Sequence, residues 1–224
     1  MIALATQRSP LDIVVVGSND GRYNDPLYQT LKGPLQQRSR VTLIEPQDLL
    51  RPFIEDNFAF HSDVKIIEAA VGGSGVLTLH RIGRDHWDRA QPSYAKDWPL
   101  YRAPTGVTSG HRTHVEDWVR EHMKDVEDPS TVIETIDVTA ETLPVLLACA
   151  GRPAEIDVLQ IDAEGADDNV LRHADLPRTQ PAIIFFESKL LDKEQRAFVD
   201  DLFATCGYTS FELGPDTIAF RVPR

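Results

Sequence analysis

Short apolar runs alternate with helix-like segments along most of the chain. Residues 13–17 form a continuous run rich in valine, which is typical of a strand covered on both faces of a sheet. Residues 41–45 and 64–71 repeat the pattern and predict a second and a third strand. Between the first two strands, Asp25 followed by Pro26 indicates a helix start. The chain therefore opens as alternating strands and helices.

The same alternation resumes in the second half of the chain. Further strands are predicted at residues 132–138, 156–161, 182–187, 208–213 and 217–222. Between the predicted strands at residues 182–187 and 208–213, a helix begins with a capping box at Asp192 and Gln195 and ends at Gly207. The last two strands follow each other through a Gly-Pro-Asp turn and predict an antiparallel hairpin. Strands that alternate with helices imply a parallel sheet with crossover connections.

One long segment interrupts this regular pattern. Residues 81–130 hold all three tryptophans and four of the seven histidines, with several prolines and one predicted helix. Loops of this length inside compact domains usually act as lids or binding segments. We therefore expect a single α/β domain over residues 1–224, with a doubly wound, mostly parallel sheet and a lid or substrate-binding insertion at 81–130. The glycine cluster at residues 72–75 predicts a hairpin turn rather than a phosphate loop, because no helix or Gly-Lys-Ser/Thr string follows.

Composition narrows the classes of partner. The formal net charge of −12 disfavours binding to nucleic acid, whose phosphates the average field repels. Cys149 and Cys206 have apolar neighbours and are expected to be buried thiols rather than a disulfide or a metal site. No segment approaches the roughly 18 apolar residues of a membrane helix, and the N-terminus lacks the apolar core of a signal peptide. These features predict a cytoplasmic protein with no membrane partner.

The turn after the first strand resembles neither common nucleotide-binding fingerprint. A G-x-G-x-x-G motif starting at Gly17 would need glycines where Asn19 and Arg22 stand, and no lysine follows for a phosphate loop. Gly17 and Gly21 still allow a tight turn and a close approach to a ligand. This pattern favours a cofactor with an amino-acid tail over one with a diphosphate, the alternative being an ordinary strand-to-helix turn.

Acidic residues follow the second strand and lie within the third. Glu45 could accept both ribose hydroxyls of an adenosine, which is the usual role of an acid at that place. The alternative is a solvated acid that the dipole of the next helix favours. Glu68 could flank an adenine, or it could equally face the solvent.

A second acidic group follows the strand at residues 156–161. Asp162 and Glu164 lie close together, so that one carboxyl could hold a raised pKa and act as a general base. Together with Glu187 they could also bind a divalent cation, or the acids could merely cap the next helix. His111 and His114, in the inserted segment, are further candidate bases because imidazole titrates near neutral pH. Exposed loop histidines without a role are the alternative.

Several of these strings resemble the FkbM family of S-adenosylmethionine-dependent methyltransferases. The similarity spans most of the chain outside residues 81–129. The matching segments are residues 16–21 (VGSNDG), 24–28 (NDPLY), 43–46 (LIEP), 69–72 (AAVG), 156–165 (IDVLQIDAEG), 170–171 (VL), 181–187 (PAIIFFE), 207–208 (GY) and 216–219 (DTIA). The Asp-x-Glu-Gly string and the early glycine turn are specific in combination.

The resemblance implies a class I methyltransferase fold, in which a seven-stranded sheet has its last strand antiparallel. It implies S-adenosylmethionine as the cofactor and a hydroxyl of a sugar or secondary metabolite as the acceptor. The implied cofactor-binding residues are Gly17, Ser18, Asn19, Gly21, Glu45, Pro46, Glu68, Ala69 and Asp162. Asp162 and Glu164 would lie where the cofactor meets the acceptor. Many class I enzymes carry an acid two residues before the first glycine, where this chain has Val15.

For methyl transfer to a hydroxyl, Asp162 is the first candidate for the general base, with His111, His114 and Glu187 behind it. A cation bound to the acidic cluster could lower the hydroxyl pKa instead. Two other classes remain open on the sequence alone. One is an NAD(P)-dependent oxidoreductase, which the missing third glycine disfavours. The other is a non-catalytic homologue that keeps the cofactor pocket, which Val15 favours.

Overall fold

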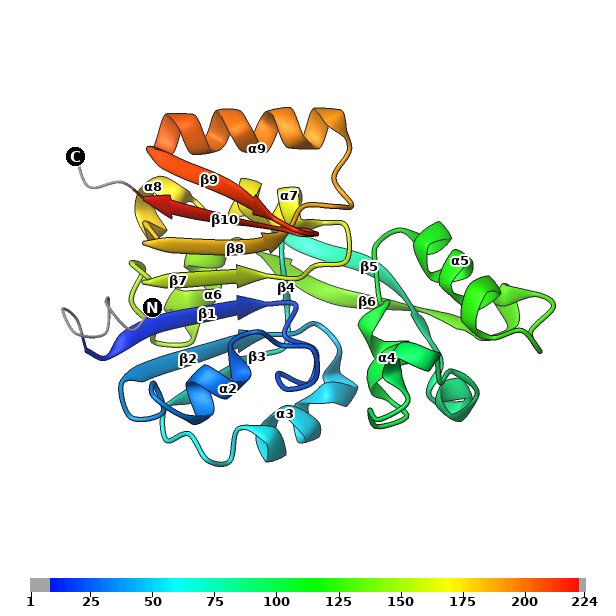
Figure 1. The fold of residues 1–224 in the computed structure, drawn as a ribbon. Coiled ribbons are helices and arrows are strands. Elements are labelled where there is room, and N and C mark those ends of the chain that lie inside the picture. The colour runs from blue at the N-terminus through cyan, green and yellow to red at the C-terminus, as the bar shows by residue number, and fades with distance from the viewer. Residues whose placement is uncertain (1–8, 222–224) are drawn as a thin grey trace. The chain divides into compact units, whose positions relative to one another are not determined.

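The computed structural model describes residues 9–221, which form two compact units (Figure 1). The first unit joins the part of the chain up to Gly75 to the part from Ala140 onward, and it contains the large sheet. The second unit comprises residues 76–139. Each unit has a hydrophobic core of its own.

The large sheet has seven strands. Their spatial order is β3 (Val64–Ile67), β2 (Ser39–Ile44), β1 (Leu11–Val16), β7 (Val158–Ile161), β8 (Ile183–Glu187), β10 (Asp216–Arg221) and β9 (Tyr208–Leu213). The first five strands are parallel, whereas β10 runs antiparallel to both β8 and β9. This arrangement confirms the predicted mostly parallel sheet with a C-terminal antiparallel hairpin.

The register of the central strands aligns their carboxyl ends. Val16 at the end of β1 pairs with Ile44 of β2 on one side and with Ile161 of β7 on the other. Ile161 in turn pairs with Phe186 of β8. Ligands of open α/β sheets bind at this edge. The residues that directly follow the ends of β1, β2 and β7 are Gly17, Glu45 and Asp162.

Helices cover the sheet because its strands are apolar on both faces. Val14 and Val16 pack in one core with residues of α6 (Leu143–Cys149), α7 (Asp167–His173) and α9 (Lys193–Cys206). Ile13 and Val15 point to the opposite face, since side chains alternate along a strand, and both are fully buried. The remaining helices of this unit are α2 (Tyr28–Lys32), the 3-10 turn η1 (Asp48–Leu50), α3 (Arg51–Asn57) and α8 (Leu176–Thr179).

Local signals in the sequence fix several helix ends. The Asp25 carboxylate accepts backbone N–H bonds from Leu27 and Tyr28 at 2.7 and 2.9 Å, but α2 begins only at Tyr28, with Leu27 as its N-cap and Gly33 as its C-cap. The predicted helix start at Asp25 and Pro26 is therefore wrong by two residues, because these residues form the turn that leads into the helix. The capping box of α9 forms as predicted, with Asp192 and Gln195 exchanging bonds.

The second unit forms around a small core of its own. Its elements are β5 (Gly75–Ile82), η2 (Arg84–Arg89), η3 (Ser93–Ala95), α4 (Arg102–Gly106), α5 (Arg112–His122), η4 (Pro129–Thr131) and β6 (Ile133–Glu141), the last of which runs into the first unit. Trp87 and Trp118 pack against the buried residues of this core. These two rings therefore stabilise the inserted segment. Whether the segment acts as a lid remains a prediction.

The predicted third strand divides into two. Residues 64–67 form β3 of the large sheet, whereas β4 (Ala70–Val71) pairs with the last residues of β6 in a small separate sheet. Glu68 lies between the two strands, exposed, and forms an ion pair with Arg51. The hairpin expected at residues 72–75 is also wrong, because β4 pairs with β6 rather than with β5.

The two cysteines are free thiols with different surroundings. Cys206 is half-buried beside the main core, but Cys149 is exposed, which corrects the predicted buried thiol. Cys149 is the last residue of α6, whose buried residues Leu143, Leu146 and Leu147 precede it. Within residues 9–221, no helix is long and apolar enough to cross a membrane.

Candidate active site

The turn after β1 lies between the ends of β2 and β7. The backbone N–H of Gly17 donates to the carbonyl of Ile44 at 2.9 Å, and the N–H of Asp162 donates to the carbonyl of Val16 at 2.9 Å. Gly17 has a φ of +73°, and a Cβ atom there would lie 1.9 Å from the carbonyl oxygen of Asp162. Only glycine allows the backbone of β1 to approach β7 this closely.

Hydrogen bonds to buried polar side chains stabilise the rest of this turn. Asn19 is buried with a φ of 48°, and its Oδ1 accepts the N–H of Asp20 at 2.9 Å. The fully buried Asp20 carboxylate in turn accepts the N–H groups of Arg22 and Tyr23 at 3.0 and 3.1 Å. The turn is therefore fixed by side chain to backbone bonds, as expected of Asn and Asp in tight turns.

Glu45 joins this turn to the end of β2. Its Oε2 accepts the backbone N–H of Asn19 at 2.8 Å, and its Oε1 accepts bonds from the backbone and the side chain of Gln47 at 3.0 and 3.1 Å. The residue is only 4% exposed. The predicted alternative of a solvated acid is therefore wrong. Glu45 is a buried carboxylate with a fixed orientation.

The other predicted cofactor residues differ in their placement. Ser18 is buried beside Gly17, and its Oγ has no hydrogen-bond partner in the described part of the chain. Pro46 is half-buried next to Glu45, and Ala69 is buried just beyond β3. Glu68 is exposed and its carboxylate bonds to Arg51. Of this set, Glu68 is the residue that the fold turns toward the solvent.

The loop after β7 carries the acidic cluster. Glu164 and Gly165 both adopt positive φ angles, of 48° and 90°, so that the chain reverses sharply after Asp162. Asp167 at the start of α7 is fully buried. Its carboxylate accepts the backbone N–H of Ala163 at 3.3 Å and that of Glu187 at 3.2 Å. Asp167 thus ties the loop to the end of β8.

Burial raises the pKa of the Asp167 carboxyl to about 7, because its two backbone hydrogen bonds only partly replace the lost hydration. A raised pKa was expected within this cluster, with Asp162 and Glu164 as the foremost candidates. Asp167 is fully shielded from the solvent and would not contact a ligand. Its effect on the site is to position the loop after β7 and the end of β8, which its carboxylate connects.

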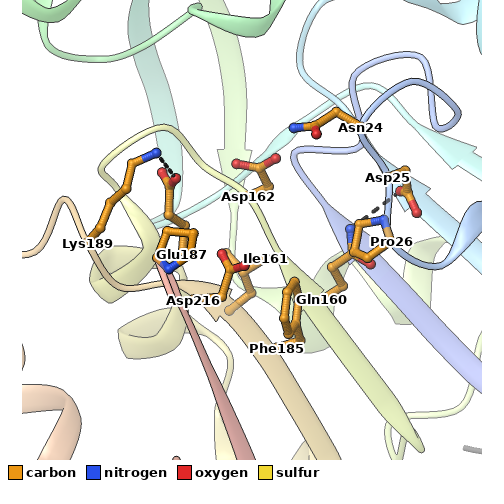
Figure 2. A pocket seen from close by; sticks show the side chains of 11 residues that line it. Asn24, Asp25, Pro26, Gln160, Ile161, Asp162, Phe185, Glu187, Lys189 and Asp216 are labelled. Atoms are coloured by element: carbon orange, nitrogen blue, oxygen red, sulfur yellow. Dashed lines mark hydrogen bonds and ion pairs between the residues drawn. The ribbon is translucent and has the colours of Figure 1, made fainter. Parts of the chain in front are cut away.

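A cavity of about 450 Å³ opens beside Asp162 (Figure 2). Figure 2 shows Asp162 between two groups of side chains, with Asn24 and Asp25 on one side and Glu187 and Lys189 on the other. The lining residues come from the segment before α2 and from the ends of β7, β8 and β10; they are Asn24, Asp25, Pro26, Gln160, Ile161, Asp162, Phe185, Glu187, Lys189, Pro215 and Asp216. Its volume falls in the usual range for small-molecule sites.

Charged groups dominate one wall of this cavity. The Lys189 Nζ atom lies 2.6 Å from Glu187 Oε1, and this hydrogen bond raises the pKa of the lysine. Asp216 is the cross-strand neighbour of Glu187. Burial, reinforced by the nearby Glu187, raises the pKa of the Asp216 carboxyl.

The structure brings together some of the predicted catalytic residues. Asp162 and Glu187 line the same cavity. His111 and His114 belong to the second unit, where His111 precedes α5 and is exposed and His114 lies half-buried on that helix. Their role as bases remains a prediction.

The described residues offer no support for a metal centre. No group of three or more His, Cys, Asp or Glu side chains in residues 9–221 is arranged to hold a metal ion. The divalent-cation alternative for Asp162, Glu164 and Glu187 therefore has no geometric basis in this part of the chain.

Sequence reasoning missed Gln160 and Asp216. Gln160 stands alone as a polar residue in the buried strand β7, which is a detectable signal because buried polar side chains need partners. Asp216 was placed in a turn, and its proximity to Glu187 depends on the pairing of β10 with β8.

The sequence matches a known protein family but no individual curated protein. A family profile described as Methyltransferase FkbM domain matches residues 16–210. A sequence search of curated proteins found no match.

Solved structures similar to this one include a methylase and two fibrillarins. A ribosomal protein L11 methylase from Lactobacillus delbrueckii subsp. bulgaricus is 10% identical, with a TM-score of 0.43 over 97% of this chain and 73% of its own. A pre-rRNA processing fibrillarin from Methanococcus jannaschii is 9% identical, with a TM-score of 0.43 over 97% and 69%. An Aeropyrum pernix fibrillarin with natively bound S-adenosyl-L-methionine is 8% identical, with a TM-score of 0.43 over 99% and 74%.

Proposed function

Because the chain belongs to the FkbM family of S-adenosylmethionine-dependent methyltransferases, we propose that it methylates a hydroxyl oxygen of a small acceptor such as a sugar or a secondary metabolite. One observation carries the proposal. The buried turn after β1, the buried carboxylate of Glu45 and the cavity beside Asp162 lie along a single edge of the sheet. That edge is where open α/β sheets bind their ligands.

The residues at this edge fit an adenosyl cofactor with an amino-acid tail. Gly17, Asn19 and Gly21 would line the methionine portion, where the absence of a Cβ at Gly17 keeps the backbone close. The buried Ser18 Oγ, which lacks a partner among residues 9–221, is available as a donor to that portion. Glu45 would accept the ribose hydroxyls.

The methionine ammonium needs an acceptor other than the residue at position 15. Val15 is fully buried within the sheet and carries no charge. Asp162 directly follows β7, and its backbone N–H bonds to the carbonyl of Val16 at the end of β1, so its carboxylate is the first candidate. Backbone carbonyls of the turn are the alternative. Either partner places the reacting end of the cofactor beside the cavity.

The chain's own contribution to the chemistry is to align the acceptor and to remove its proton. When bound, the cofactor supplies a methyl group already activated by a positively charged sulfur. The Asp162 carboxylate, which lines the cavity, would accept the proton that the acceptor hydroxyl loses as its oxygen takes the methyl group. Asp167 holds the loop after Asp162 against the end of β8, which limits the movement of the base.

We expect the substitution Asp162→Asn to lower kcat by about 100-fold or more, since an amide cannot accept the hydroxyl proton. The measurement is S-adenosylhomocysteine release with a panel of monosaccharide acceptors, paired with calorimetric titration of S-adenosylhomocysteine. Asp200→Asn, an exposed carboxyl on α9, is the matched control and should behave as wild type.

Two results would separate the roles of Asp162. Normal cofactor binding with an unchanged kcat would exclude Asp162 as the base. Loss of S-adenosylhomocysteine binding in Asp162→Asn would identify its carboxylate as the partner of the methionine ammonium.

A further inference from the structure

The cavity beside Asp162 carries more negative than positive charge. Four carboxylates line it, from Asp25, Asp162, Glu187 and Asp216, whereas Lys189 is the single basic residue among its lining residues. The Lys189 ammonium already bonds to Glu187. The remaining field therefore favours a cation and repels an anion.

The Asp216 carboxylate is compensated only at a distance, by the ammonium of Lys189. It lies directly opposite Glu187 across the antiparallel pair of β8 and β10, where like charges destabilise each other. Among the described residues, no donor lies within hydrogen-bond distance of its side chain. Burial and the neighbouring Glu187 raise the pKa of this carboxyl, so a positively charged group beside it would relieve an unfavourable interaction.

Gln160 provides an independent sign that the cavity takes a ligand. The residue is 3% exposed in the middle of the sheet, and its Nε2 donates to Asp25 Oδ2 at 3.4 Å. Its Oε1 is buried without a hydrogen-bond partner in the described part of the chain. An unpartnered buried amide oxygen is unfavourable unless a ligand or water donates to it.

The Asp216 carboxylate and the Gln160 Oε1 atom are both hydrogen-bond acceptors without a donor among the described residues. An ammonium group has three donors and no acceptor, and a hydroxyl has one donor. Asp216 and Gln160 stand on strands two apart in the sheet and are offset by two residues along them, which corresponds to about 12 Å between their backbones. One ligand that reaches both must therefore carry donor groups at separate positions. A carboxylate or phosphate would instead add further acceptors and negative charge.

We propose that the methyl acceptor is a hydroxylated amine, bound with its ammonium at Asp216 and a hydroxyl at Gln160 Oε1. This inference rests on the methyl-transfer function proposed above and names the class of acceptor. The proposal predicts selectivity by charge. A sugar that carries an amine should bind more tightly than the same sugar that carries a carboxylate.

The test compares three monosaccharide probes of similar shape, namely glucosamine, glucose and glucuronate. Their dissociation constants are measured near neutral pH by ligand-observed NMR titration of the full chain without cofactor. We expect glucosamine to bind at least about tenfold more tightly than glucuronate, with glucose between them. Glucosamine binding no more tightly than glucuronate would overturn the proposal.

The substitution Asp216→Asn locates the effect. It should reduce the preference for glucosamine over glucuronate about tenfold without lowering the melting temperature, because burial and the repulsion by Glu187 outweigh the attraction of Lys189 for this carboxylate. The control Asp201→Asn removes an exposed charge on α9 and should keep the preference. A preference that survives in Asp216→Asn would also contradict the proposal. Calorimetry with S-adenosylhomocysteine is run separately, so that failure of the methyltransferase proposal is distinguished from failure of this one.

Discussion

Replacing Gly17 with alanine is expected to destabilise the fold by at least about 3 kcal/mol and to abolish binding of S-adenosylhomocysteine. The new Cβ would lie 1.9 Å from the carbonyl oxygen of Asp162, and the φ of +73° is unfavourable for alanine. The turn must then move away from β7, which separates it from the Asp162 loop. Urea denaturation measures the first effect and calorimetry the second.

Gly151→Ala is the matched control. Gly151 also has a positive φ, of +68°, but no atom lies within 4 Å of the position that its Cβ would occupy. This variant should lose only about 1–2 kcal/mol, the cost of the left-handed conformation, and should retain cofactor binding. Equal stability of the two alanine variants would show that the close approach of β1 to β7 does not constrain the site.

The second large effect concerns pH. Because the pKa of Asp167 rises from 3.8 to about 7 on folding, the folded state retains a proton that the unfolded state has lost between these values. The free energy of unfolding should therefore fall as pH rises from about 4 to about 7, by about 4 kcal/mol from this group. Urea denaturation at pH values across this window measures the change.

The contribution of Asp167 is isolated by comparison with Asp167→Asn. The amide does not ionise, so the variant should lack this part of the pH dependence, and the difference between the two proteins cancels other titrating groups. Asp201→Asn, which removes an exposed carboxyl on α9, should retain the wild-type slope. The same slope in wild type and Asp167→Asn would refute the assignment.

The order of the main strands could be anticipated where the sequence carries local signals. The valine-rich run of the first strand and the Asp192 capping box depend on near neighbours, and both are present in the structure. The helix expected from Asp25 and Pro26 also forms, but it starts at Tyr28, two residues later than predicted. The run at residues 64–71 was misleading because its division depends on a distant partner. Residues 140 and 141 pair with β4 and draw it into a separate sheet.

The candidate site shows the same division between local and distant information. Glu45 and Asp162 directly follow strands, so their place at the sheet edge follows from the pattern of the chain alone. Asp216 belongs to the cavity because β10 pairs with β8, and Gln160 because the segment that holds Asp25 lines the same cavity. The burial of Asp167 could not be anticipated, since the sequence does not show which carboxyl of an acidic segment loses its hydration.

The central claim is that an adenosyl cofactor binds at the edge formed by Gly17, Glu45 and Asp162. Calorimetric titration of S-adenosylhomocysteine into the wild type and into Glu45→Gln tests it most directly, with the exposed Glu55→Gln as the control. We predict saturable binding to the wild type and the control, weakened at least about tenfold in Glu45→Gln. No heat with the wild type at millimolar ligand, or equal affinity in Glu45→Gln, would contradict the account.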